Sequence, residues 1–76
     1  MPEAYVLLNT EIGAEREVLR NLKKIEGVQE AFNLAGIYDI IAKIKTDSDE
    51  KLTQLVNEKL QISKVHSKLT IIVTEP

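Results

Sequence analysis

The chain has 76 residues, which is enough for one folded domain and too few for two. Apolar residues make up 43% of it, and most of them are Ile, Leu or Val, so the composition is that of a globular protein. The absence of cysteine excludes disulfides, thiolate metal sites and cysteine nucleophiles, and a single histidine, His66, excludes a multi-histidine metal centre. The net charge of −2 argues against nucleic acid as the main partner. No apolar run is long enough to span a membrane and the N-terminus lacks the features of a signal peptide, so we expect a cytoplasmic protein without a membrane partner.

The apolar pattern predicts six elements of secondary structure. In chain order they are a strand at residues 3–8, a helix at 14–25, strands at 28–35 and 37–46, a helix from 48 to about 60, and a strand at 65–74. Ser48 is the expected N-cap of the second helix, Gly27 ends the first, and Gly36 supplies the positive φ of a tight hairpin. The order β-α-β-β-α-β predicts an α+β, ferredoxin-like fold. Its four-stranded antiparallel sheet has both helices on one face and the first strand between the third and the fourth.

Alternation along the strands predicts which side chains face the helices and which lie on the open face of the sheet. The side chains expected to face the helices are Val6, Leu8, Tyr38, Ile40, Ala42, Ile44, Leu69, Ile71 and Val73. Those expected on the open face are Tyr5, Leu7, Asp39, Ile41, Lys43, Lys45, Lys68, Thr70 and Ile72.

The centre of the expected open face is too apolar to leave in water. Full burial of a large apolar side chain is worth about 1.5–3 kcal/mol. We therefore predict an oligomer interface formed by Tyr5, Leu7, Ile41 and Ile72, with lysines at its rim. RNA binding by this face is a weaker interpretation, because the third strand presents no stacking aromatic residue there.

The sequence contains no catalytic constellation. His66 has neither an orienting carboxylate nor a nucleophile placed by any motif, and no glycine-rich phosphate loop is present. We therefore expect no enzyme activity, no bound metal and no cofactor. Asp39 remains unexplained, because aspartate is a poor strand former. Either it accepts backbone hydrogen bonds in the hairpin, or it binds the ammonium group of an α-amino acid whose carboxylate meets amides near Gly36; the residues leave both open.

Residues 36–41, Gly-Ile-Tyr-Asp-Ile-Ile, resemble the G-x-Y-D motif and following aliphatic residues of the effector domain of Lrp/AsnC-type (feast/famine) transcriptional regulators, also called the RAM domain. Residues 16–22 and 25–28 resemble its first helix and the entry to its second strand, and residues 65–73 resemble its last strand. The resemblance therefore covers the whole chain. It implies a transcription-regulating module that binds an amino acid, forms homodimers through its sheets, and assembles into octamers or larger rings.

The resemblance also implies a ligand site, to which Gly36, Tyr38 and Asp39 of the motif and Thr70 of the last strand correspond. Two positions depart from the family pattern, since Lys68 replaces a threonine and Lys64 replaces a glycine. Full regulators carry an N-terminal helix-turn-helix, whereas here the first strand follows Met1 almost directly. Residues 1–76 are therefore expected to be a single effector domain without a DNA-binding domain, which contacts no operator itself and co-assembles with full-length Lrp/AsnC regulators.

Three alternatives remain. An ACT-type amino-acid-binding domain shares the strand order, although residues 9–13 fit its ligand loop only loosely. A structural assembly module without any ligand would need no more than the apolar open face. A small dimeric α+β monooxygenase or isomerase-like barrel would need polar groups pointing into the subunit, and the inward stripes are aliphatic.

Overall fold

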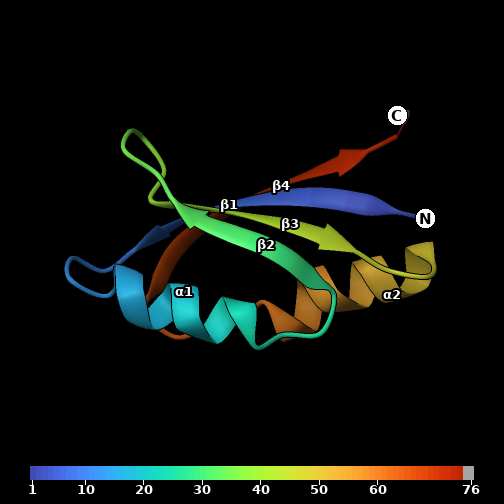
Figure 1. The fold of residues 1–76 in the computed structure, drawn as a ribbon, viewed down its shortest axis with the longest axis horizontal. Coiled ribbons are helices and arrows are strands. Elements are labelled where there is room, and N and C mark those ends of the chain that lie inside the picture. Colours follow the sequence, from blue (N-terminus) through green and yellow to red (C-terminus); the bar gives the residue numbers. More distant parts are fainter. Residues whose placement is uncertain (75–76) are drawn as a thin grey trace.

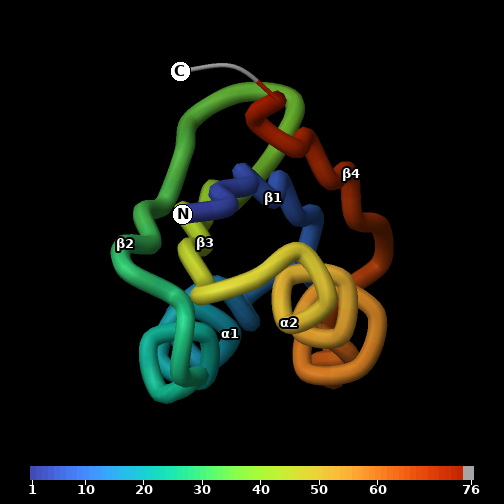
Figure 2. The backbone as a smooth tube through the Cα atoms, turned by 90° about the vertical axis from the view of Figure 1, so that its right-hand side faces the viewer, coloured from blue at the N-terminus to red at the C-terminus, as the bar shows by residue number. Residues whose placement is uncertain are grey.

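A four-stranded sheet and two helices form two layers (Figure 1). A computed structural model describes residues 1–74 of the chain. Its elements are β1 (Glu3–Thr10), α1 (Glu15–Lys23), β2 (Val28–Asn33), β3 (Ile40–Lys45), α2 (Asp49–Gln54), the π-helix η1 (Leu55–Lys59) and β4 (Val65–Val73). The strands lie in the order β2-β3-β1-β4, and every neighbouring pair is antiparallel. Both helices lie side by side against one face of the sheet (Figure 2), so the predicted ferredoxin-like fold is confirmed.

The core lies between the sheet and the helices. Every second residue of β1 and of β3 is buried, as expected for strands covered on one face. The core side chains that are at most 2% exposed are those of Ala4, Val6, Leu8, Val18, Leu22, Ile40, Ala42, Ile44, Leu52 and Leu60. No element of residues 1–74 covers the other face of the sheet (Figure 2).

The second helical segment begins at its predicted cap. Ser48 has an extended backbone, and its side-chain oxygen accepts a hydrogen bond from the backbone N–H of Lys51 at 3.2 Å. The segment widens into η1, where the N–H of Leu60 donates to the carbonyl of Leu55 at 3.0 Å. Within residues 1–74, no helix has the length and apolar character that crossing a membrane requires.

Gly27 brings the turn after α1 against η1. Its φ is +101°, and a Cβ built there would lie 2.5 Å from Cδ1 of Leu55. The backbone N–H of Lys45 also donates to the carbonyl of Gly27 at 2.9 Å. A side chain at this position would therefore meet both backbone strain and a steric clash.

The predicted tight hairpin around Gly36 is wrong, because β2 ends at Asn33 and β3 begins only at Ile40. Residues 34–39 form a loop instead, and Tyr38 therefore does not extend the stripe of β3 that faces the helices. The loop is closed by a hydrogen bond from the N–H of Leu34 to the carbonyl of Asp39 at 2.7 Å. It is held to β1 by Asp39, whose N–H donates to the carbonyl of Leu8 at 2.9 Å.

The predicted faces of the last strand are also wrong. Leu69 lies opposite Leu7, and Ile71 lies opposite Tyr5, so both are on the open face and not against the helices. By the same register Val73 is on the open face, and Lys68, Thr70 and Ile72 are on the helix side. A hydrogen bond from Nζ of Lys68 to the carbonyl of Val56 in η1, at 2.7 Å, agrees with this placement. Alternation fails here because β4 is an edge strand with large aliphatic side chains on both faces, and because a lysine can bury its stem while its ammonium reaches a carbonyl.

Candidate functional site

An apolar row crosses the open face of the sheet from edge to edge. Phe32 of β2 lies opposite Ile41 of β3, Ile41 lies opposite Leu7 of β1, and Leu7 lies opposite Leu69 of β4. Phe32 is 57% exposed and Leu69 is 43% exposed, while Leu7 and Ile41 are half-buried. We call this set, together with Tyr5, Ile71 and Val73, the apolar sheet face.

Charges border the apolar sheet face and are matched within the chain. Lys43 lies opposite Tyr5 on one side and Glu30 on the other. Nζ of Lys45 lies 3.7 Å from Oε1 of Glu3. The predicted placement of Lys43 and Lys45 on this face is confirmed. A second copy packed on the face would meet cross-strand pairs of opposite sign, which avoids repulsion between like charges.

Three of the four residues predicted for an oligomer interface, namely Tyr5, Leu7 and Ile41, lie on the apolar sheet face. Ile72 does not, because it pairs with buried Ala4 on the helix side and is 54% exposed there. Phe32 was missed. Its neighbour Ala31 is buried under the helices. The small Ala31 next to the large Phe32 was therefore the sequence signal that could have placed Phe32 on the open face.

The motif at residues 36–39 is organised by its aspartate. Oδ2 of Asp39 accepts a hydrogen bond from the backbone N–H of Thr10 at 2.8 Å and lies 3.5 Å from the hydroxyl of Thr10. Thr10 is only 7% exposed, so this carboxylate satisfies a buried amide at the end of β1. Asp39 is therefore a brace between the loop and β1.

The four predicted ligand residues do not converge in the structure. Gly36 is exposed at the loop tip, where a Cβ would have no atom within 4 Å, and Tyr38 beside it is half-buried. Thr70 lies opposite Val6, whose other neighbour is Ala42. Ala42 follows Asp39 by three residues along the chain, a separation of roughly 10 Å in a strand. Thr70 also lies on the helix side of the sheet, so one chain does not bring it to the hairpin.

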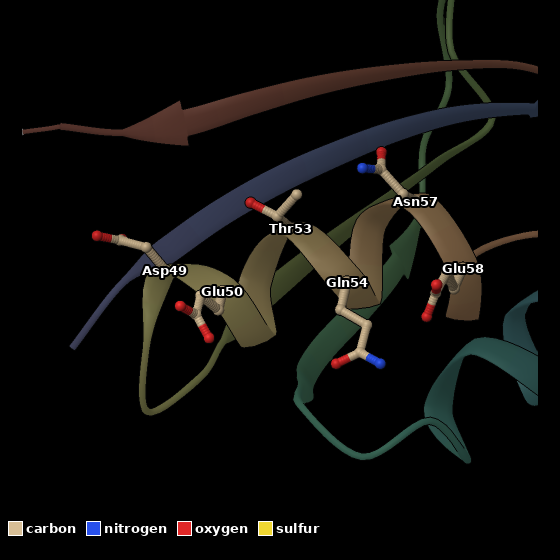
Figure 3. A pocket seen from close by; sticks show the side chains of 6 residues that line it. All are labelled: Asp49, Glu50, Thr53, Gln54, Asn57 and Glu58. Carbon is tan, nitrogen blue, oxygen red and sulfur yellow. The ribbon is translucent and has the colours of Figure 1, made fainter.

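Two open hollows lie elsewhere on the surface. One, of about 480 Å³, runs along α2 and η1 and is lined by polar side chains, three of which are Thr53, Gln54 and Asn57 (Figure 3). The other, of about 450 Å³, lies between the turn at Gly27 and the loop after β3. Neither is lined by residues 34–39 or by Thr70. Within residues 1–74, no three His, Asp or Glu side chains are grouped to hold a metal ion.

Lys64 ties the start of β4 to α1. Its φ of +71° is a left-handed conformation that favours glycine. Its carbonyl accepts a hydrogen bond from the N–H of Glu11 at 2.9 Å. Its Nζ lies 3.0 Å from Oε1 of Glu17, and this hydrogen bond and the negative charge of Glu17 raise the pKa of Lys64 above its usual value of 10.5. A lysine at this position thus has an unfavourable backbone conformation and gains an ion pair with Glu17.

Comparisons with known proteins identify the class of domain. The family model described as the Lrp/AsnC ligand binding domain matches residues 3–76. This is a family of ligand-binding domains of transcriptional regulators and not of enzymes, which agrees with the expected lack of enzyme activity. The chain belongs to the Lrp/AsnC ligand binding domain family.

Individual relatives support this assignment. The HTH-type transcriptional regulator FL11 of Pyrococcus abyssi is 33% identical over 70 residues, which cover 92% of this chain and 46% of FL11. The chain thus spans about half the length of the curated relatives it matches. Two solved structures match nearly end to end. FFRP-DM1 has 35% identity and a TM-score of 0.91 and covers 96% of this chain and 99% of its own. PHS023 from Pyrococcus horikoshii has 34% identity and a TM-score of 0.92 and covers 100% of this chain and 93% of its own.

Proposed function

We propose that this chain is an amino-acid-binding, self-assembling regulatory module. It acts in the cytoplasm, either by forming homodimers and larger rings or by co-assembling with full-length Lrp/AsnC regulators. The observation that carries the proposal is the apolar sheet face, which spans all four strands and is uncovered in an 8.6 kDa domain.

The apolar sheet face exposes large apolar side chains, and their burial against a second copy can hold two copies together. A stable interface buries about 800 Å² on each partner, and the single chain exposes 5165 Å² in all. Phe32, Leu69 and Ile71 are each 43–57% exposed. Their burial would therefore give the largest gain in hydrophobic free energy on this face. A few residues near the centre of such a contact contribute most of its binding energy, and tyrosine, which Tyr5 supplies here, is enriched among them.

The aspartate of the hairpin supports amino-acid binding with one restriction. Oδ2 of Asp39 already accepts the N–H of Thr10, so the second carboxylate oxygen is the one that an ammonium group would approach. Thr70 would reach such a ligand only from another copy, because its own chain places it across the sheet. We therefore place the ligand site between copies, in the assembled form.

Two measurements test the proposal. Light scattering at micromolar concentration gives the mass, which we expect to be at least that of a dimer, and Ile41→Asp should lower it by placing a charge in a desolvated contact. A thermal-shift screen of the twenty amino acids tests the ligand. At a concentration of about 100 times Kd a ligand stabilises by about 2.7 kcal/mol, which raises the Tm of a domain this small by roughly 10 °C or more. A monomeric wild-type protein would refute self-assembly.

A second candidate is a structural assembly module without a ligand. Two observations favour it. The carboxylate of Asp39 already accepts a hydrogen bond from Thr10 of the same chain, and neither of the two hollows described above is lined by residues 34–39 or by Thr70. If the protein is a dimer and none of the twenty amino acids changes its Tm, this candidate replaces amino-acid binding. The match to the Lrp/AsnC family favours both over an ACT-type domain.

A further inference from the structure

The two helical segments differ in the sign of the charges that form a row along their outer surfaces. Four exposed basic residues recur at helical spacing on the side of α1 opposite buried Val18 and Leu22. They are Arg16, Arg20 and Lys23 of the helix and its C-cap residue Lys24. We call these four residues the basic helix face.

On α2 and η1 the exposed residues Glu50, Gln54 and Glu58 form a row opposite buried Leu52, and they lie along one side of the segment in Figure 3. We call these three residues the acidic helix face. Exposed charges of the other sign lie beside each row, namely Glu17 on α1 and Lys51 and Lys59 on α2 and η1.

Ion pairs among residues 1–74 do not neutralise the charges of the two faces. The three ion pairs within residues 1–74 join Lys45 to Glu3, Lys51 to Asp47 and Lys64 to Glu17, and none involves either face. The two faces therefore remain available to a partner.

Complementarity to the helix dipole explains only part of this pattern. Acidic residues near a helix N-terminus and basic residues near its C-terminus are stabilising. Arg16, however, lies in the first turn of α1, and Glu58 lies in the last turn of the second helical segment. Each is at the end where its charge is unfavourable, so these two residues extend the faces at a cost to their own helices.

We propose that the basic helix face of one copy binds the acidic helix face of a second copy. The two helices lie side by side with uncovered outer surfaces (Figure 2). A two-fold axis that lies between two such helix layers and runs parallel to the helices brings α1 of each copy against α2 of the other, so both pairs of opposite faces are satisfied at once. This contact uses the layer opposite the apolar sheet face, so a chain can make both contacts and assemble beyond a dimer.

A second copy fits these surfaces better than nucleic acid does. The basic helix face has four cations, but the acidic helix face lies beside it in the same layer and would repel phosphates. The net charge of the chain is −2, whereas a nucleic-acid-binding surface is usually supported by a basic domain.

The test is the mass of the assembly as a function of salt, measured by light scattering. The Debye length is about 30 Å at about 10 mM salt and about 3 Å at about 1 M salt. The wild-type protein should exceed the dimer mass at the lower concentration and return to the dimer at the higher one. Neutralising the basic helix face with Arg20→Glu and Lys24→Glu, or reversing the acidic one with Glu50→Lys and Glu58→Lys, should weaken the salt-sensitive step by about tenfold or more.

Charge exchange provides the decisive variant. The protein that carries Arg16→Glu, Arg20→Glu, Lys23→Glu and Lys24→Glu together with Glu50→Lys and Glu58→Lys exchanges the signs of the two faces, so it should recover the salt-sensitive assembly. Glu11→Lys changes an exposed loop residue and serves as the control, which should assemble like the wild type.

Three results would overturn the proposal. They are a wild-type mass that does not change with salt, salt-sensitive assembly that survives the substitutions in either face, and an exchange variant that fails to recover assembly while retaining its thermal stability. Retardation of an RNA or DNA duplex at low salt that is lost with Arg20→Glu and Lys24→Glu, without a change in mass, would assign the basic helix face to nucleic acid instead. At high salt the contact through the apolar sheet face alone should hold the dimer together. If that contact does not exist, the protein is a monomer at high salt, which distinguishes this failure from the failure of the helix contact.

Discussion

Truncation of Asp39 tests its role as a brace. Asp39→Ala removes the acceptor of the Thr10 N–H, which is 2.8 Å from Oδ2 in a residue that is 7% exposed. A buried amide left without a partner costs about 1–3 kcal/mol. Asp39→Asn keeps an oxygen acceptor and loses only the charge, so the expected loss is about 1 kcal/mol, the difference between a charged and a neutral acceptor. In a domain of this size, 1 kcal/mol lowers Tm by about 4–8 °C.

Urea denaturation and thermal melts of the two variants measure these losses. Asp47→Ala is the matched control, since it removes a carboxylate whose side chain is 71% exposed and whose ion pair to Lys51 is on the surface. It should change the free energy of unfolding by less than about 1 kcal/mol. If Asp39→Ala is as stable as the wild type, the brace does not exist. If Asp39→Asn weakens the binding of a confirmed amino acid by tenfold or more at unchanged stability, its carboxylate belongs to the ligand site.

Three further predictions concern other parts of the chain. Gly27→Ala should destabilise the protein by about 2–4 kcal/mol, because it combines a left-handed backbone with the clash against Leu55. Gly13 has a φ of +86° and free space around it, so Gly13→Ala should lose only the stability that the backbone strain costs. Equal losses of the two variants in urea denaturation would exclude the clash. Because the pKa of Lys64 is raised in the folded state by Glu17, the stability that this pair contributes is complete below pH 10.5 and is lost as the pH rises through the folded-state value. The difference in Tm between the wild type and Lys64→Gln should therefore shrink above pH 10.5, and a constant difference would contradict the ion pair. The purified protein should show no sequence-specific DNA binding, and selective, salt-resistant retardation of a duplex would contradict this.

Much of the fold could be predicted from the sequence where one physical signal dominated. The alternation in β1 and β3 is unambiguous, because one face is aliphatic and the other contains Tyr5, Lys43 and Lys45. The capping side chain of Ser48 and the turn at Gly27 are local effects, so a single residue type was sufficient to find them. The order of elements then determined the topology.

The failures occurred where a longer-range contact decides the local structure. In β4, Leu69, Ile71 and Ile72 are all aliphatic, so only pairing with β1 fixes which of them faces the helices. In the hairpin, Asp39 is bonded to the backbone at Leu8 and Thr10 of β1 as well as to Leu34, and the local pattern of residues 36–39 does not contain the contacts to β1.

The candidate site was predicted less well than the fold, for the same reason. The residues of the motif at 36–39 are local and were found together, but Thr70 is far from them in space and can join them only through another copy. The small residue Ala31 beside Phe32 was a signal for the face on which Phe32 lies, but the position of Phe32 opposite Ile41 depends on strand pairing, which a sequence pattern does not contain.

The most direct test of the central claim compares two adjacent residues of β4. Ile71 and Ile72 are 48% and 54% exposed, but Ile71 lies on the apolar sheet face and Ile72 on the helix side. The masses of Ile71→Asp and Ile72→Asp are measured by light scattering at about 1 M salt, where the Debye length of about 3 Å suppresses contacts between charged surfaces. If assembly occurs through the apolar sheet face, Ile71→Asp is a monomer and Ile72→Asp keeps the dimer mass of the wild type. A dimeric Ile71→Asp beside a monomeric Ile72→Asp would contradict this account.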